Sequence, residues 1–252
     1  MDDDLQLLID LHKGEYRQGP GADQETEKAI RLANIDPKTP YNIADIGCGT
    51  GASTLTLART LNCEITAVDF LDQFLEELQR RAEQEGVANK ISTLCASMDS
   101  LPFDPESFDI IWSEGAIYNI GFKQGISDWL QYLKPGGLLV VSEICWITAE
   151  RPKEIEDYWN NQYSEIATAS AKIRQLEEEG YSPVGYFILP EHCWLDNYYY
   201  PIERSFESFL QRNNNSKAAQ EIVEPEKEEI ELYEKYKRYY SYGMYIARKP
   251  SN

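Results

Sequence analysis

Apolar and polar residues follow two different spacing patterns along this chain. Between residues 41 and 146, short apolar runs take turns with segments whose apolar residues recur every three or four positions. The short runs predict strands, namely NIADIG, EITAVDF, ISTLCAS, FDIIWSE and LLVVSEICW, and the periodic segments predict helices, namely STLTLARTL, LDQFLEELQRRAEQEG and GISDWLQYL. Such alternation with short connections is typical of an α/β fold with a doubly wound, mostly parallel sheet.

The pattern differs on both sides of this segment. Residues 1–40 predict two helices, one with Leu5, Leu8, Ile9 and His12 at helical spacing and one with Ala29, Ile30 and Ala33. After Trp146, helices are expected over 151–166 and 170–180, and strands at SPVGYFILP and GMYIARK. The roughly fifty residues between those strands look helical and are far too many for a hairpin connection. They predict helical inserts that form a cap at the carboxyl edge of the sheet.

These elements suggest one integrated domain in three parts. Residues 1–40 form helices covering a ligand site, residues 41–147 form the ligand-binding core, and residues 148–252 complete the sheet and carry the cap inserts.

The stretch ADIGCGTGAST, residues 44–54, follows the first strand and opens a helix. Gly47, Gly49 and Ala52 satisfy GxGxxG/A, which binds a pyrophosphate at a helix N-terminus. Gly47, Gly49 and Gly51 with Asp45 in front give DxGxGxG instead. A carboxylate at Asp45 repels phosphates and attracts a cation, so this reading favours S-adenosylmethionine, which carries an ammonium and a sulfonium.

Further polar residues follow the next strands. Asp69 ends EITAVD, where an acid can accept two hydrogen bonds from a ribose diol, a feature common to both cofactors. The segment CASMDSLPF, residues 95–103, places a small polar and acidic cluster where an adenine amine can bind, and Glu114 ends FDIIWSE.

The order and spacing of DIGCGTG, VDF, SMDSLPF, FDIIWSEGA and LKPGG resemble those of class I S-adenosylmethionine-dependent methyltransferases, in particular small-molecule enzymes of the ubiquinone/menaquinone-biosynthesis type. The resemblance covers residues 41–143. It implies a Rossmann-like, seven-stranded sheet whose last strand is antiparallel. It also implies that Asp45, Gly47, Gly49 and Gly51 surround the methionine part of the cofactor, that Asp69 holds the ribose, and that Met98 and Asp99 line the adenine. The family often has an acid where this chain has Ser97, so Ser97 and Asp99 are both candidates for the adenine amine.

Four more residues complete the predicted cofactor site: Cys48, Phe70, Glu114 and Gly115. The segment RQGPG precedes the second helix, and similar proteins fold such a segment over the cofactor. Arg17 or Gln18 can then bind the cofactor carboxylate, although a plain turn fits the same residues.

Methyl transfer is an in-line displacement, so the protein chiefly positions a nucleophile and excludes water. Acceptor contacts are expected from residues after the fourth and fifth strands and from the inserts: Tyr118, Asn119, Trp146, Trp159, Tyr163 and Trp194. Spacing on one helix makes packing the favoured interpretation for Trp159 and Tyr163. Glu143 and His192 are candidates for a general base, each with a structural alternative.

Charge narrows the range of partners. The chain has 43 acidic and 24 basic residues and a net charge of −19, which disfavours nucleic acids and anionic membranes. Five cysteines without CxxC spacing predict no metal site and a reducing, cytoplasmic setting. An acidic start and the lack of a long apolar run predict no signal peptide or membrane span.

The expected function is methylation of a small molecule, with S-adenosylhomocysteine as product. The alternatives are a dinucleotide-dependent oxidoreductase and a non-catalytic S-adenosylmethionine-binding protein.

Overall fold

The strands of the chain form one twisted sheet. The structure, a computed structural model, describes residues 3–251. The strands are β1 (Tyr41–Ile46), β2 (Cys63–Asp69), β3 (Ile91–Cys95), β4 (Phe108–Ser113), β5 (Leu133–Trp146), β6 (Ala167–Thr168), β7 (Ser182–Ile188) and β8 (Tyr240–Arg248). Their order across the sheet is β3-β2-β1-β4-β5-β8-β7, and β6 pairs with β5.

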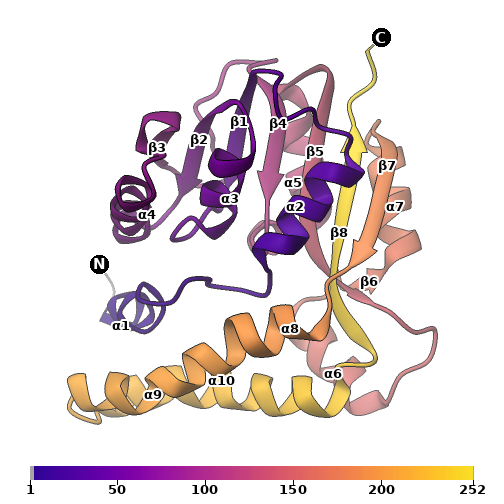
Figure 1. The fold of residues 1–252 in the computed structure, drawn as a ribbon. Coiled ribbons are helices and arrows are strands. Elements are labelled where there is room, and N and C mark those ends of the chain that lie inside the picture. The colour runs from indigo at the N-terminus through magenta and orange to yellow at the C-terminus, as the bar shows by residue number, and fades with distance from the viewer. Residues whose placement is uncertain (1–2, 252) are drawn as a thin grey trace.

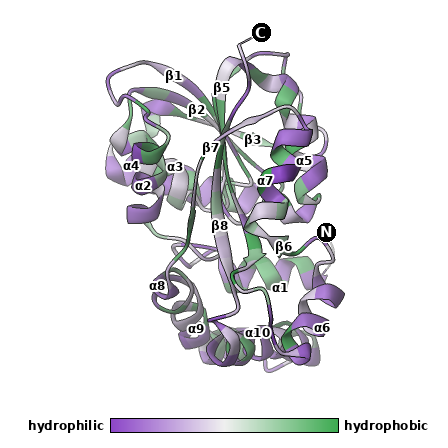
Figure 2. Ribbon diagram, turned by 90° about the vertical axis from the view of Figure 1, so that its right-hand side faces the viewer, coloured by the Kyte–Doolittle hydropathy of each residue, from purple (hydrophilic) through white to green (hydrophobic). Residues whose placement is uncertain are grey.

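Helices cover both faces of the sheet and one of its edges. They are α1 (Asp3–His12), α2 (Asp23–Leu32), α3 (Ala52–Thr60), α4 (Asp72–Glu85), α5 (Phe122–Trp129), α6 (Lys153–Gln162), α7 (Ala169–Glu178), α8 (Glu191–Trp194), α9 (Tyr200–Arg212) and α10 (Lys217–Tyr236). Helices α2, α3 and α4 lie on one face of the sheet, and α5 and α7 on the other (Figure 1, Figure 2). Helices α1, α6, α8, α9 and α10 gather below the sheet, where they form a cap.

The predicted topology is confirmed. Strands β1 to β5 are parallel, and β8 runs antiparallel between β5 and β7. The eighth strand, β6, was not expected, because two residues are too short to show a period of two.

Helix α4 illustrates how the sequence pattern sets the fold. Four of the five residues of its expected apolar face, Phe74, Leu75, Leu78 and Ala82, are each less than 7% exposed, whereas the fifth, Leu71, precedes the helix and is only partly buried. Gly86 adopts φ +71° as the helix ends, which is the left-handed conformation that glycine tolerates best.

Two of the predicted boundaries that differ from the structure affect the positions of site candidates or loops. The helix expected over 151–166 ends at Gln162, so Tyr163 lies outside it. The KPGG segment, expected to precede the fifth strand, belongs to β5, whose register against β4 shifts between Phe108 and Ile110. Gly136 with φ +81° allows this irregularity.

The cap and the sheet share a hydrophobic core. One buried cluster includes Ile43 and Val140 from the sheet together with Trp194, Phe209 and Tyr233 from the cap. The indole of Trp194 stacks on Tyr233 at 4.5 Å and on Tyr242 of β8 at 5.1 Å between ring centroids. This stacking joins the cap to the last strand.

Gly51 provides a test of packing between α3 and α4. It has φ +92°, and a Cβ placed there would collide with the Leu78 side chain of α4. We expect Gly51→Ala to lower the free energy of unfolding by about 2–5 kcal/mol, the sum of left-handed strain and overpacking. Chemical denaturation followed by circular dichroism measures the change.

Gly86→Ala is the matched control, because Gly86 also has a positive φ but nothing lies within 4 Å of the place that a Cβ would take. It should lose only the strain of about 1–2 kcal/mol. Equal losses in the two variants would show that the contact with Leu78 does not limit packing.

Candidate functional site

A cavity of about 620 Å³ opens at the carboxyl edge of the parallel strands. The loops after β1, β2, β3 and β4 form one side, and α1, α10 and the turn before α9 form the other. Fourteen predicted site residues line it: Arg17, Gln18, Gly47, Cys48, Gly49, Asp69, Phe70, Ser97, Met98, Asp99, Glu114, Gly115, Tyr118 and Asn119.

The glycine loop lets backbone approach the cavity closely. Gly47 and Gly49 have φ +73° and +56°. A Cβ at Gly47 would collide with Ala116, and one at Gly49 would lie 2.6 Å from Gln18 Oε1. The amides of Gly47 and Cys48 donate to the Val68 carbonyl at 2.8 and 2.9 Å, which fastens the loop to β2. Only residues without a side chain fit both turns.

Asp69 organises the loop from the end of β2. Its Oδ2 accepts the Gly49 amide at 2.8 Å, and its Oδ1 accepts the Leu71 amide at 2.9 Å. Burial raises the pKa of this carboxyl, and the two amide donors oppose the rise. Because each carboxylate oxygen has two lone pairs, Asp69 still has capacity for hydroxyl donors from a ligand.

The N-terminal strap, residues 13–21, is fastened over the glycine loop. Gln18 Oε1 accepts the Thr50 amide at 2.9 Å and its hydroxyl at 3.0 Å, while Gln18 Nε2 donates to the His12 and Glu15 carbonyls. Arg81 of α4 donates to Thr50 Oγ1 at 2.9 Å and to the Glu15 carbonyl at 2.8 Å. The Gln18 amide therefore holds the protein together here, which differs from the predicted bond to a cofactor carboxylate.

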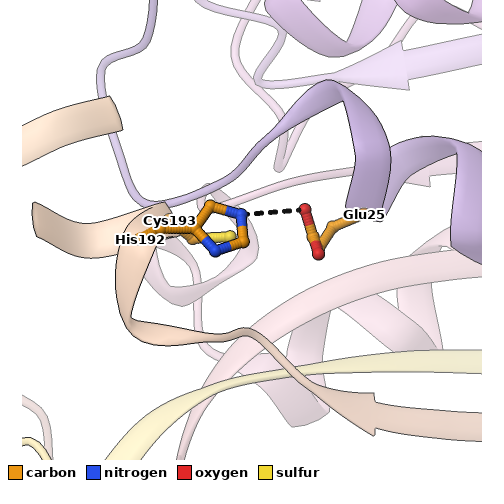
Figure 3. Close-up of side chains that lie close together, drawn as sticks. All are labelled: Glu25, His192 and Cys193. Atoms are coloured by element: carbon orange, nitrogen blue, oxygen red, sulfur yellow. Dashed lines mark ion pairs between the residues drawn. The ribbon is translucent and has the colours of Figure 1, made fainter. Parts of the chain in front are cut away.

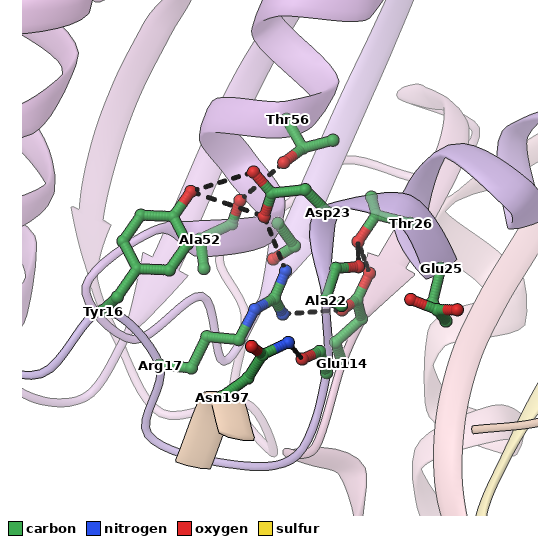
Figure 4. A network of polar contacts seen from close by, with 12 residues as sticks. Tyr16, Arg17, Ala22, Asp23, Glu25, Thr26, Ala52, Thr56, Glu114 and Asn197 are labelled. Atoms are coloured by element: carbon green, nitrogen blue, oxygen red, sulfur yellow. Dashed lines mark hydrogen bonds and ion pairs between the residues drawn. The ribbon is translucent and has the colours of Figure 1, made fainter. Parts of the chain in front are cut away.

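Arg17 also bonds to the protein. Its guanidinium donates to Glu114 Oε2 at 3.2 Å and to Asp23 Oδ1 at 3.0 Å (Figure 4). Glu114 Oε1 accepts in addition from the Thr26 hydroxyl at 2.7 Å and from the Trp112 indole at 2.9 Å. With both terminal nitrogens paired, the Arg17 charge is balanced by carboxylates of this chain.

Asp45 lies behind the cavity wall, which corrects the prediction that it faces the ligand. It is fully buried, and its Oδ2 accepts from the Ser53 hydroxyl at 2.9 Å and from the Thr54 hydroxyl at 2.6 Å. Burial raises its pKa to about 7, against the effect of those two donors. Gly51 also lies outside the lining and instead packs against Leu78.

The predicted adenine region forms a rim after β3. The Trp129 indole donates to the Met98 carbonyl at 3.1 Å, which fixes the segment that carries Ser97 and Asp99. Phe70, with 66% of its surface exposed, stands at the same rim. An exposed aromatic ring beside a cavity offers a flat apolar surface for a ligand.

Glu143 does not line the cavity. It forms a 2.8 Å ion pair with Lys172, and both side chains are fully buried. Burial raises the pKa of Glu143 to about 7 although the ammonium opposes the rise. Glu143 therefore forms a structural pair between β5 and α7, and it has no access to a ligand as the predicted base.

His192 also lies away from the cavity. Its Nε2 is 3.4 Å from Glu25 Oε2, and Cys193 lies beside them (Figure 3). The donor atoms of these three residues fall within 4.8 Å of one another, so they are the group in the described residues that fits a metal ion best. They supply three ligands, one fewer than a structural zinc site uses, so closeness alone does not make them a metal site.

The predicted acceptor contacts at the end of the fifth strand and in the inserts pack into the core. Trp146, Trp159 and Trp194 are buried and do not line the cavity. Trp146 and Trp159 pack against Tyr240, and Trp194 donates to Ser241. Tyr163 lies behind Tyr118, with its hydroxyl accepting the Phe122 amide at 3.1 Å. Packing, the favoured interpretation of Trp159 and Tyr163, agrees with this placement.

Several lining residues were not predicted. Leu5, Leu8 and His12 come from α1, and Glu226 comes from α10. Tyr198, from a π-helical turn over Leu195–Tyr199, also lines the cavity, in line with the expectation that tyrosines 198–200 of the inserts cannot all face one interior. His12 fits an ordinary helical face, and Glu226 lies within a run of charged residues, so neither stands out in the sequence.

The raised pKa of Asp45 predicts a pH-dependent stability. A carboxyl whose pKa is higher in the folded state stabilises the fold at low pH, and this contribution is lost as pH rises through 7. Asp45→Asn removes the titration, so its unfolding free energy relative to the native protein should rise by up to about 1.4 kcal/mol per pH unit between about pH 4 and 7. Urea denaturation at three pH values measures it.

Asp104→Asn, an exposed substitution of the same kind, should follow the native curve at every pH. Parallel curves for Asp45→Asn and the native protein, separated only by a constant offset, would contradict the prediction.

The segment that builds most of this site matches a known domain. Residues 43–137 match the family model described as a methyltransferase domain. The sterol 24-C-methyltransferase of Candida albicans is 26% identical over 204 residues, which cover 76% of this chain and 54% of that protein. The chain spans about half the length of the curated relatives it matches.

Solved structures share the fold. An S-adenosylmethionine-dependent methyltransferase from Geobacter sulfurreducens, in complex with S-adenosylhomocysteine, has a TM-score of 0.83 at 18% identity, over 96% of this chain and 97% of that one. The [4+2]-cyclase SpnF has a TM-score of 0.78 at 21% identity, over 98% and 93%. Residues 43–137 thus resemble a methyltransferase domain, and the chain as a whole shares the fold of these solved structures, including their sheet of mostly parallel strands.

Proposed function

We propose that this protein transfers a methyl group from S-adenosylmethionine to a small-molecule acceptor by in-line displacement and releases S-adenosylhomocysteine. The observation that carries this proposal is the charge of the cavity. Its wall contains four carboxylates, Asp69, Asp99, Glu114 and Glu226, against one guanidinium, Arg17, which is paired with Glu114 and with Asp23. Such a wall attracts the ammonium and sulfonium groups of the cofactor.

The same charge opposes the oxidoreductase alternative. A dinucleotide carries two phosphates, and a site for it needs unpaired donors or cations near the glycine loop. Here the Gly49 amide is bonded to Asp69, and the Thr50 amide is bonded to Gln18. The preference for a cationic cofactor over a dinucleotide, which the sequence analysis attributes to Asp45, thus comes from other carboxylates that line the cavity.

The residues around the cavity support distinct roles. The glycine loop and Asp69 would hold the methionine and ribose parts, and the rim of Phe70, Ser97, Met98 and Asp99 the adenine. Tyr118 and Asn119 would meet the acceptor. A volume of about 620 Å³ lies within the usual range for sites that take small molecules.

The net charge and the cysteines bear on the partners and the cellular compartment of the protein. The net charge of −19 disfavours nucleic acid as a partner. Cys48, Cys63, Cys95, Cys145 and Cys193 are free thiols, which supports a reducing, cytoplasmic compartment. Among the helices in residues 3–251, none is both long and apolar enough to cross a bilayer. The ubiquinone-type acceptor remains a prediction from the sequence.

The binding preference is tested by isothermal titration calorimetry. We expect S-adenosylhomocysteine to bind saturably and NADH to give no saturable heat at the same concentrations, because the wall repels phosphates. Binding of NADH without S-adenosylhomocysteine would instead favour an oxidoreductase. Incubation with methyl-labelled cofactor and a metabolite extract then tests transfer, and failure to label any small molecule would favour a binding protein without transferase activity.

Asp69→Asn tests the loop geometry. In the native protein, the backbone N–H groups of Gly49 and Leu71 each donate to one oxygen of the Asp69 carboxylate. In the variant, the NH2 group of the asparagine side chain replaces one of these oxygens and cannot accept a hydrogen bond, so the loop loses a charge-assisted hydrogen bond. We expect the Kd for S-adenosylhomocysteine to rise by about tenfold to a hundredfold, as for a loss of about 1.5–3 kcal/mol. Asp72→Asn, at an exposed position in the first turn of α4, is the matched control and should leave the Kd unchanged.

A further inference from the structure

The side of the cavity next to the cap combines leucine, tyrosine, histidine and glutamate side chains. It is formed by Leu5, Leu8 and His12 of α1, by Tyr198 of the π-helical turn, by Glu226 of α10 and by Tyr118 after β4. Helix α1 packs directly against α10, which brings His12 and Glu226 to one place although they come from opposite ends of the chain (Figure 1). The group faces the loops assigned above to the cofactor, where an acceptor must enter.

The polar groups here lack hydrogen-bond partners. His12 is only 6% exposed, and its buried Nδ1 has no partner within the described residues. Glu226 Oε2 is likewise buried and unpartnered in that part of the chain. The other pair of atoms, His12 Nε2 and Glu226 Oε1, is 3.6 Å apart, which is too long for a hydrogen bond. Unpaired buried groups are costly, and a ligand that carries N–H donors would lower this cost.

Two acidic side chains of α10 lie at this end of the cavity. Glu229 lies one turn after Glu226 and accepts the Tyr199 hydroxyl at 2.7 Å. Burial raises the pKa of Glu229 to about 7, and the charge of Glu226 adds to the rise. Burial raises the pKa of Tyr198 too, and Glu226 and Glu229 raise it further. Both acidic groups therefore lie close enough to act electrostatically on a ring that lines the cavity.

A cation would be stabilised at this position in two ways. Carboxylates attract it directly, and the faces of tyrosine rings attract cations through their quadrupole. An anionic acceptor would meet repulsion from Glu226, and Arg17 cannot offset it because that guanidinium is paired with carboxylates. The side chains of Leu5 and Leu8 offer apolar surface beside the charged groups.

We propose, on the basis of the function proposed above, that this end of the cavity is the acceptor subsite and that it binds an amine in its ammonium form. Glu226 holds the ammonium, Tyr118 and Tyr198 supply ring faces, and Leu5 and Leu8 contact the apolar part of the acceptor.

Three probes with one carbon skeleton test the charge preference: phenethylamine, 2-phenylethanol and phenylacetate. Each is titrated by calorimetry into the full chain saturated with S-adenosylhomocysteine. We expect the amine to bind about tenfold more tightly than the alcohol and the acid to bind least, because of the carboxylates and ring faces. If the alcohol or the acid binds as tightly as the amine, or if none of the three binds, the subsite proposal is overturned.

Variants connect the preference to its residues. Glu226→Gln keeps the shape of the side chain and should reduce the preference for the amine over the alcohol to about threefold or less, since one charge pair is lost. Tyr118→Leu should also reduce it, and Tyr118 is 41% exposed, so its substitution leaves the core intact. Glu228→Gln removes the same charge from an exposed position of α10 outside the cavity and should change nothing.

Affinity for S-adenosylhomocysteine separates the two proposals. A variant that retains this affinity is folded, so an unchanged amine preference in Glu226→Gln overturns the subsite while the methyltransferase proposal stands. If the native chain fails to bind S-adenosylhomocysteine, the proposed function itself is wrong.

Discussion

The hydrogen bonds between the N-terminal strap and the glycine loop hold the site together. Gln18 bridges the loop to the end of α1, and Arg81 reaches from α4 to the same Thr50 and to the strap carbonyls. Three segments that are distant in sequence thereby become one wall. Since His12 lies directly before this strap, the same bonds fix the position of α1 over the cavity. These bonds therefore fix one side of the cavity in place.

Charge in this protein is divided between two kinds of place. Asp45 of β1 and Glu143 of β5 are buried and do not line the cavity, and burial favours their protonated forms. The cavity wall instead carries the carboxylates of Asp69, Asp99, Glu114 and Glu226. The first group contributes to the pH dependence of folding, and the second sets which ligands are attracted. An acid next to a glycine loop can belong to either group, and its environment decides which.

The fold follows closely from the sequence, but only part of the site does. The buried face of α4 repeats at a period that the residue pattern records directly. Asp69 was placed correctly at the cavity because the loops after parallel strands share one edge of the sheet. Trp194 has the residue type of a ligand contact, yet it stacks on Tyr242 in the core, and sequence cannot distinguish these uses. His12 and Glu226 meet only because α1 packs on α10, a contact that no local pattern reports. Predictions therefore succeed where one element decides the outcome and fail where two distant elements must meet.

The position of β8 has a consequence for synthesis. This strand is the last in the described chain, yet it pairs with both β5 and β7, and Lys249 just beyond it exchanges hydrogen bonds with Gly136 and Gly137. Until Tyr240–Arg248 has left the ribosome, β5 presents an open edge and β7 has no neighbour. The nascent chain therefore passes through a stage with unpaired strands, in which association with other chains competes with folding.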